Sequence, residues 1–222
     1  MLTDAQVQAL DAAWSSARAD GALGSATSEE LYDHAAGFVP AASVVFGAGG
    51  DGALAGSVCI DVGTGAGVPG VLLALQHPTS RWRLVDASER RCGFARRAVQ
   101  ALDLGARVEV VHGRVDELAR SAGWRGSAEL VTARLFGAPA EVAECALPLV
   151  APGGHLVVSA SVETMVVWRG ADLSAVGGVV AGSWDTAPGS RSPGSFIAIR
   201  RAGDIDARFP RRPASRRRAP LF

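Results

Sequence analysis

From residue 57 onwards, short apolar runs alternate with longer segments that are apolar on one face only. Short apolar runs bounded by glycine or polar residues are typical of buried strands, whereas apolar positions spaced three to four residues apart are typical of helices. The pattern predicts strands and helices in strict alternation, followed by a closing hairpin. The predicted strands are 58–62, 82–86, 107–111, 128–132, 154–159, 176–183 and 194–200, and the predicted helices between them are 68–76, 89–102, 115–121 and 138–149.

Strands that alternate with helices form parallel sheets, because each helix returns the chain to the starting edge of the sheet. We therefore expect an α/β protein with a Rossmann-like fold: a seven-stranded, mostly parallel sheet, its last strand antiparallel, with helices on both faces. Helices are also predicted at 4–19 and 27–46, with a loop at 47–56. At 222 residues the chain fits one domain with appendages. The predicted parts are an N-terminal helical extension (1–56), a cofactor-binding domain (57–203) and a basic C-terminal tail (204–222).

The run VCIDVGTGAGVPG, residues 58–70, joins the first predicted strand to the next helix. Gly63, Gly65 and Gly67 alternate in this run, and glycine allows a sharp turn and close approach of a ligand to the backbone. Pro69 suits the first turn of the helix, where its missing N–H has no partner to lose. A strand, a glycine-rich turn and a helix in this order are typical of a nucleotide-cofactor loop. The alternative is a glycine turn that binds nothing.

Two acidic residues indicate the type of cofactor. Asp61 ends the first strand, where a carboxylate would face a cationic cofactor such as S-adenosylmethionine and would repel a pyrophosphate. Asp86 ends the second strand, 25 residues later, where a carboxylate can accept hydrogen bonds from both ribose hydroxyls. The alternative for Asp61 is that its side chain caps the glycine turn. Because ligands of parallel sheets lie beyond the carboxyl ends of the strands, 112–116 and 132–134 also belong to the expected site.

Composition narrows the remaining possibilities. All 22 basic residues are arginine, and residues 200–222 hold eight of them against two aspartates. Such a tail is either a phosphate-binding arm or a solvated segment. Cys59, Cys92 and Cys145 lie apart in apolar segments, which favours reduced thiols in a cytoplasmic protein. The scattered histidines argue against a metal site, and the acidic amphipathic N-terminus and lack of a long apolar run argue against a signal peptide and a membrane span.

Six segments, taken in order and spacing, resemble the GidB/RsmG family. They are DVGTGAGVPG, LVDASERR, VHGRVDE, VTARLFGAP, ALPLVAPGGHLVV and FPRRPASRRRAPLF, and the likeness runs from about residue 31 to the C-terminus. The chain looks like a divergent, actinobacterial-type member. The resemblance implies a class I methyltransferase fold, S-adenosyl-L-methionine as cofactor and methylation of N7 of a guanine in bacterial 16S rRNA, with the RNA or the 30S subunit as partner.

Carried over by position, the family's cofactor contacts fall on Gly63, Val68, Val115, Asp116 and Arg134, in addition to the residues argued above. Val115 and Asp116 match a pair that frames the adenine, and Arg134 matches an arginine after the fourth strand. The alternative for Asp116 is an acid that stabilises a helix N-terminus, and for Arg134 an arginine paired with a surface acid. The resemblance also favours an RNA-facing role for tail arginines, namely Arg211, Arg212, Arg216, Arg217 and Arg218.

Guanine N7 carries a lone pair and no proton, so its methylation requires positioning but no general base. We assign no catalytic residue from the sequence. Two departures from the family bear on the substrate: the fifth strand ends in VVSASVE without the lysine and glycine of many members, and LYDHAAGFV lacks an Asp-Ser pair. The alternatives are therefore a methyltransferase of the same fold that acts on a small molecule, and a non-catalytic module that binds cofactor or RNA. We expect a monomer.

Overall fold

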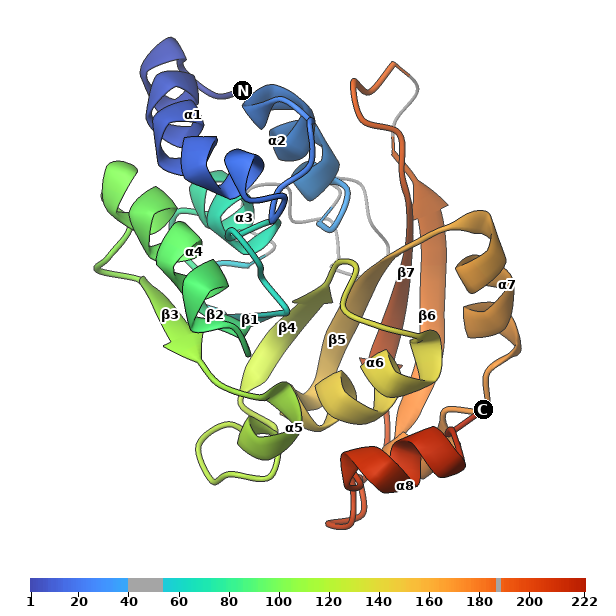
Figure 1. Cartoon of the computed structure of the whole chain (residues 1–222). Helices are drawn as coiled ribbons and strands as arrows, with labels where there is room; N and C mark the ends of the chain where they lie inside the picture. The colour runs from blue at the N-terminus through green and yellow to red at the C-terminus, as the bar shows by residue number, and fades with distance from the viewer. Residues whose placement is uncertain (40–53, 187–188) are drawn as a thin grey trace.

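The computed structural model describes residues 1–39, 54–186 and 189–222. Its helices are α1 (Asp4–Ala19), α2 (Ser28–Ala36), α3 (Gly70–Gln76), α4 (Glu89–Ala101), α5 (Val115–Leu118), α6 (Pro139–Ala146), α7 (Val162–Gly170) and α8 (Pro213–Arg218). Its strands are β1 (Val58–Val62), β2 (Arg81–Asp86), β3 (Val108–His112), β4 (Ala128–Ala133), β5 (Val150–Ala160), β6 (Gly178–Asp185) and β7 (Ser195–Arg201). Figure 1 shows these elements along the chain.

The seven strands form one sheet in the order β3-β2-β1-β4-β5-β7-β6. The first five strands are parallel to one another, whereas β7 is antiparallel to both β5 and β6. This arrangement confirms the predicted fold class, including the antiparallel last strand and the closing hairpin. The order reverses between β1 and β4, so the carboxyl ends of these two strands flank the crevice in which doubly wound sheets bind ligands.

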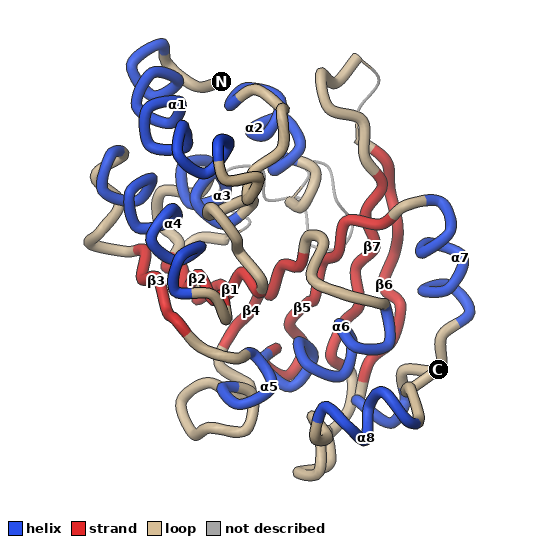
Figure 2. The backbone as a smooth tube through the Cα atoms, viewed as in Figure 1, coloured by secondary structure: helices blue, strands red, loops and turns tan. Residues whose placement is uncertain are grey.

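Helices cover both faces of the sheet, as Figure 2 shows. Side chains of a strand point alternately to opposite faces, and in β1 Cys59 joins one buried cluster while Ile60 and Val62 join the other. The first cluster contains apolar residues of the helices α1, α2, α3 and α4, and the second contains those of α6 and α7. Both faces are therefore buried, which explains why the central strands read as continuous apolar runs.

Most element boundaries differ from the prediction by one or two residues and a few by more, as α6 does by ending at Ala146. α2 ends at Ala36, with Gly37 as its C-cap, while residues 40–46 of the predicted helix and 47–53 of the predicted loop lie outside the described residues. The predicted helix 115–121 is regular only over Val115–Leu118. β5 begins at Val150, earlier than predicted, because a register shift in β4 lets it pair on both sides of the shift.

The helices α7 and α8 are not predictable from the sequence pattern. In α7 the residues Val162, Val166 and Val167 are exposed while Met165 and Trp168 are buried, so apolar residues occur on both sides and no stripe is visible. In α8 three consecutive arginines follow Pro213, and the segment has almost no apolar residues to show a period. Cys59, Cys92 and Cys145 are buried free thiols. Among the described helices, none has the length and apolar character needed to cross a membrane.

Candidate cofactor site

A cavity of about 380 Å³ opens at the carboxyl ends of β1, β2, β3 and β4. Its volume falls within the range of about 300–1,000 Å³ that is usual for small-molecule sites. The wall is formed by four loops, one after each strand, and by parts of the N-terminal segment, α6 and α8. The residues that line it are Ala22, Leu23, Gly63, Thr64, Gly65, Ala66, Val68, Asp86, Ala87, Arg91, Gly113, Arg114, Val115, Asp116, Arg134, Leu135, Phe136, Glu141, Cys145 and Arg216.

The loop after β1 has the conformation that its glycines predict. Gly63, Gly65 and Gly67 have φ values of +67°, +58° and +98°, which disfavour any residue with a side chain. A Cβ on Gly63 would lie 2.7 Å from Cδ2 of Phe136, so the loop after β4 packs directly on this glycine. Gly63, Gly65 and Val68 line the cavity as predicted, whereas Gly67 does not and serves the turn.

The orientation predicted for Asp61 is wrong. Its side chain is completely buried beneath the loop and does not line the cavity. Its carboxylate accepts hydrogen bonds from the hydroxyls of Thr64 (2.6 Å) and Thr132 (2.8 Å) and from the backbone N–H of Gly70 (3.1 Å). Asp61 therefore ties the loop to β4 and to the start of α3, which is the capping role considered as the alternative. Gly70 permits this contact, because its own Cβ would lie 2.9 Å from the Asp61 carboxylate.

Burial raises the pKa of Asp61 from 3.8 to about 6, against the opposing effects of its hydrogen bonds and of the Arg134 charge. The folded state thus binds this proton more tightly than the unfolded state, so the stability contributed by Asp61 is present at low pH and is lost as pH rises through about 6. Asp61→Asn lacks this titration. Between pH 4 and pH 7 we expect the variant to gain about 2–3 kcal/mol of unfolding free energy relative to the natural chain. Urea unfolding at several pH values measures the difference, and parallel curves would contradict the assignment.

Asp86 lies at the end of β2 with its carboxylate in the cavity wall, as predicted. One oxygen accepts a hydrogen bond from the N–H of Gly65 (3.0 Å), and the other from the N–H of Ser88 (2.8 Å) and from Nε of Arg91 (2.9 Å). The side chain is 2% exposed. These bonds fix the carboxylate against the glycine loop, where it can accept further hydrogen bonds from a ligand.

Val115 and Asp116, at the start of α5, both line the cavity. Asp116 is bound by two arginines: Arg114 Nε lies 3.1 Å from Oδ1, and both terminal nitrogens of Arg216 lie 3.2 Å from Oδ2. Burial tends to raise the pKa of Asp116, but the two guanidinium groups outweigh it and hold the pKa below its usual value. Asp116 is thus an ionised acceptor at neutral pH. Asp116 therefore lies at a helix start and also lines the cavity, so the two interpretations of this residue are compatible.

Arg134 follows β4 and also lines the cavity. Within the part of the chain that the structure describes, no hydrogen bond or ion pair engages its guanidinium, although the buried Asp61 lies near enough to influence its charge. Burial lowers the pKa of Arg134, which means that its charge is poorly solvated. The surface pair considered as the alternative is absent among these residues. A half-buried cation with no partner in a cavity wall is suited to an anionic group of a ligand.

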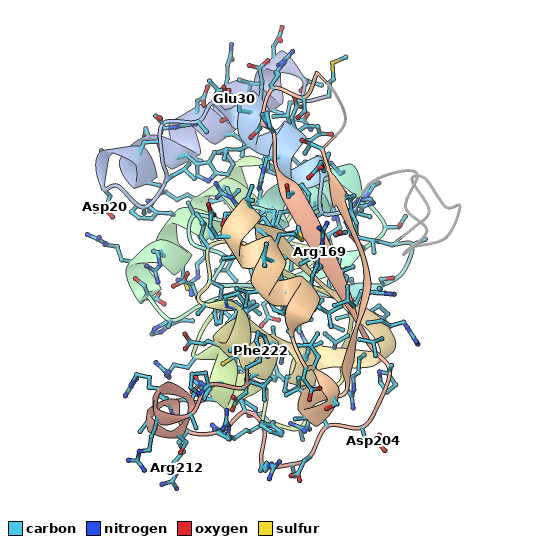
Figure 3. The ribbon with its side chains drawn as sticks, turned by 90° about the vertical axis from the view of Figure 1, so that its right-hand side faces the viewer. Asp20, Glu30, Arg169, Asp204, Arg212 and Phe222 are labelled. Carbon is cyan, nitrogen blue, oxygen red and sulfur yellow. The ribbon has the colours of Figure 1, made fainter. Side chains whose placement is uncertain are left out.

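The structure divides the five tail arginines into two groups. Arg211 pairs with Glu144 and Arg216 with Asp116, so acids of the protein itself engage these two guanidinium groups. Arg212, Arg217 and Arg218 are exposed. Figure 3 shows Arg212 on the outer side of α8, away from the sheet. Within α8, Arg216 is separated from Arg217 and Arg218 by helical geometry, because consecutive residues of a helix face different directions, whereas Arg211 and Arg212 precede the helix.

Parts of the cavity wall that the sequence does not predict come from distant segments. Trp14 of α1 donates a hydrogen bond from Nε1 to the carbonyl of Ala66 (2.8 Å), so the N-terminal segment holds the glycine loop. Ala22 and Leu23, from the same segment, line the cavity, as do Glu141 and Cys145 of α6. No local pattern marks these residues. Other lining residues do lie within the recognised segments, among them Arg91 and Arg114 beside the predicted Asp86 and Asp116. No cluster of histidine, cysteine or acidic residues suited to a metal ion occurs among the described residues.

The strand order, the glycine loop and the cavity define a class I methyltransferase fold. Residues 42–163 match the family model GidB, described as rRNA small subunit methyltransferase G. The chain belongs to this family. The ribosomal RNA small subunit methyltransferase G of Lacticaseibacillus paracasei is 32% identical over 169 residues, which are 74% of this chain and 69% of the relative. That of Salinispora tropica is 40% identical over 127 residues, 55% of this chain. The chain spans about half the length of these relatives: the match covers 52% of the Salinispora tropica protein and 43% of the corresponding protein of Salinispora arenicola.

Solved structures with little sequence identity share the fold. A predicted O-methyltransferase from Agrobacterium tumefaciens has a TM-score of 0.57 at 19% identity, over 78% of this chain and 82% of that one. The cyclase SpnF has a TM-score of 0.56 at 15% identity, over 80% and 82%. Since the second of these is described as a cyclase, the fold alone does not determine the reaction.

Proposed function

We propose that the protein transfers a methyl group from S-adenosylmethionine to N7 of a guanine in bacterial 16S rRNA. The observation that carries the proposal is the combination found in one cavity of a GidB-family chain: a glycine loop, two fixed carboxylates and a guanidinium without a partner among the described residues. When bound, the cofactor supplies an electrophilic methyl group on its sulfonium. The glycine loop allows its close approach, Asp86 accepts a hydrogen bond from a ribose hydroxyl, and Asp116 accepts one from the adenine amino group. Arg134 binds the carboxylate of its methionine part.

The acceptor chemistry fits the side chains present. Attack by guanine N7 removes no proton, so the site has to align the base with the methyl group and exclude water. No histidine lines the cavity among the described residues. Burial raises the pKa of the Cys145 thiol to about 12, so this group is protonated at neutral pH and supplies neither a base nor a nucleophile. These properties favour guanine N7 over acceptor groups that a base must first deprotonate. They also favour it over ring carbons that an enzyme nucleophile must first attack.

The rim of the cavity after β4 offers a surface for the target base. Leu135 is 88% exposed and has a φ of +54°, an unfavourable conformation for a residue with a branched side chain. It lies between Arg134 and Phe136, which both line the cavity. Strained residues persist where the surrounding structure holds them, often beside active sites. We therefore place the entering guanine against Leu135 and Phe136, where aromatic and apolar side chains can contact its face.

Cofactor binding is tested separately from the acceptor. S-adenosylhomocysteine should raise the melting temperature of the protein, because a ligand that binds only the folded state stabilises it by mass action. NAD at the same concentration serves as the control and should leave the melting temperature unchanged. Protection by NAD and none by S-adenosylhomocysteine would show that the cavity holds a different cofactor.

The exposed arginines of α8 are proposed to contact RNA phosphates. Replacing Arg217 and Arg218 with alanine should weaken RNA binding and lower the slope of log affinity against log salt by about 0.7–0.9 for each phosphate that is no longer bound. Affinity for S-adenosylhomocysteine should not change. Arg96→Ala, which removes an exposed arginine paired with Glu89, is the matched control. An unchanged salt slope in the double variant would favour a small-molecule acceptor, and binding without any turnover would favour a non-catalytic module. Action on ribosomal RNA or the 30S subunit places the protein in the cytoplasm.

A further inference from the structure

The C-terminal tail packs tightly against the domain. Arg211 is bound to the buried Glu144 of α6 through its backbone N–H (2.7 Å), its Nε (2.9 Å) and a terminal nitrogen (2.6 Å). Arg125 donates hydrogen bonds to the carbonyls of Phe209 (2.7 Å) and Ile205 (2.8 Å). At the end of the chain the ring of Phe222 lies 6.1 Å from that of Trp168 in α7. These contacts hold α8 beneath α5 and α6, where Figure 1 shows it.

One side chain of α8 reaches the cavity from this position. The Arg216 side chain is 6% exposed, lines the cavity and directs both terminal nitrogens at Oδ2 of Asp116, each at 3.2 Å. One of these nitrogens also lies 3.7 Å from a carboxylate oxygen of Glu141. Its Nε is buried without a hydrogen-bond partner among the described residues. Arg216 therefore bridges α5 and α6 at the wall of the cavity.

The contacts of the Asp116 carboxylate show which of its hydrogen-bond acceptor positions remains open to a ligand. Oδ2 faces both nitrogens of Arg216 and one of Arg114 (3.3 Å), whereas Oδ1 has one such contact among the described residues, an ion pair with Nε of Arg114 at 3.1 Å. A carboxylate oxygen can accept two hydrogen bonds, so Oδ1 retains one position for a donor in the cavity. The Arg114 side chain is 50% exposed, which makes the buried Arg216 the more rigid of the two supports.

From this geometry we infer that Arg216 is a positioning residue of the cofactor site: by holding Asp116 from the C-terminal helix, it makes the tail part of the adenine-binding wall. The inference rests on the proposed function, since it assigns the free Oδ1 position to the adenine amino group. A guanidinium holds a carboxylate with two nitrogens in a fixed plane, which an ammonium group cannot do. Loss of Arg216 leaves Asp116 paired with the exposed Arg114 alone and free to change its rotamer.

Calorimetric titration of the full chain with S-adenosylhomocysteine and with S-inosylhomocysteine tests this inference. The second compound lacks the adenine amino group and presents an acceptor instead. Arg216→Ala should weaken binding of S-adenosylhomocysteine by about tenfold and reduce the preference over S-inosylhomocysteine by a similar factor. Arg208→Ala, which removes an exposed arginine of the same tail, should leave both values unchanged. A purely structural role would not alter the preference between the two compounds.

Arg216→Lys guards against failure of the alanine variant to fold. It keeps the charge but not the planar pair of donors, so we expect a folded protein with weakened and less selective binding. Natural affinity and natural preference in either folded variant would overturn the inference. Failure of the natural chain to bind S-adenosylhomocysteine would instead overturn the proposed function, so the two failures are distinguishable.

Discussion

Asp86→Ala is expected to weaken binding of S-adenosylhomocysteine by about a hundredfold or more. One position of the Asp86 carboxylate is open to a ribose hydroxyl, and a hydrogen bond to a carboxylate is worth about 1.5–3 kcal/mol. The substitution also releases the N–H of Gly65, which donates to Asp86 at 3.0 Å and helps to fix the glycine loop. Both effects lower affinity for the cofactor, and neither requires loss of the fold.

Two controls separate ribose recognition from damage to the loop. Glu109→Ala removes an exposed acid from the neighbouring strand β3 and should bind as the natural chain does. A 2′-deoxy analogue of S-adenosylhomocysteine should lose affinity for the natural chain but little more for Asp86→Ala, because the hydroxyl and its acceptor form one interaction. If Asp86→Ala binds with natural affinity, the ribose assignment is wrong. A full additional loss with the analogue would place the hydroxyl on another residue.

Arg211→Ala is expected to cost about 3–5 kcal/mol of unfolding free energy, the usual effect of removing one partner of a buried ion pair. Glu144 is 1% exposed, and Arg211 supplies three hydrogen bonds to its carboxylate. The alanine variant retains the backbone N–H but leaves the buried carboxylate without a counter-charge. For a chain of this length the melting temperature should fall by about 10 °C.

Arg212→Ala is the matched control for this prediction, because Arg212 is adjacent in sequence but exposed. Its effect on the unfolding free energy should stay within about 0.5 kcal/mol. Replacing both members of the pair with apolar residues, Arg211→Met with Glu144→Leu, should restore much of the lost stability, since no charge then remains buried. Equal urea midpoints for Arg211→Ala and Arg212→Ala would show that the pair does not anchor the tail.

The ion pair between Arg211 and Glu144 limits how the tail can be tested for RNA binding. Deletion of residues 208–222 removes the exposed arginines, but it also removes Arg211 and Arg216 and leaves Glu144 and Asp116 without their partners. A truncated protein would lose stability and part of its cofactor site together. Point substitutions of the exposed arginines are therefore the appropriate experiment.

Much of the fold was predictable because its signals are local. The glycine run and the apolar strands depend on residues that are neighbours in sequence, and the ends of parallel strands identify the site without coordinates. The orientation of Asp61 was not predictable in this way. A carboxylate at a strand end suits a ligand and a turn equally well, and the choice depends on Thr132, which lies 71 positions further along the chain.

The different surroundings of the five tail arginines were not predictable for a related reason. Five arginines in a short basic segment look equivalent in sequence, yet Arg211 and Arg216 face buried acids of α5 and α6 while the others face solvent. Arg216 and Asp116 are 100 positions apart, and nothing in either segment marks the pairing. Likewise, the contact of Trp14 with the glycine loop depends on the packing of α1 against the domain. The division of the chain into extension, cofactor domain and tail stays a prediction.

Transfer of radiolabelled methyl from S-adenosylmethionine to 30S subunits tests the central claim most directly. The subunits should come from a strain that lacks its own guanine-N7 enzyme, so that the acceptor position is unmodified. We expect label in the 16S rRNA that is recovered as 7-methylguanine after digestion. Absence of label from the RNA, in a protein that demonstrably binds S-adenosylhomocysteine, would contradict the proposed substrate while leaving the cofactor site intact.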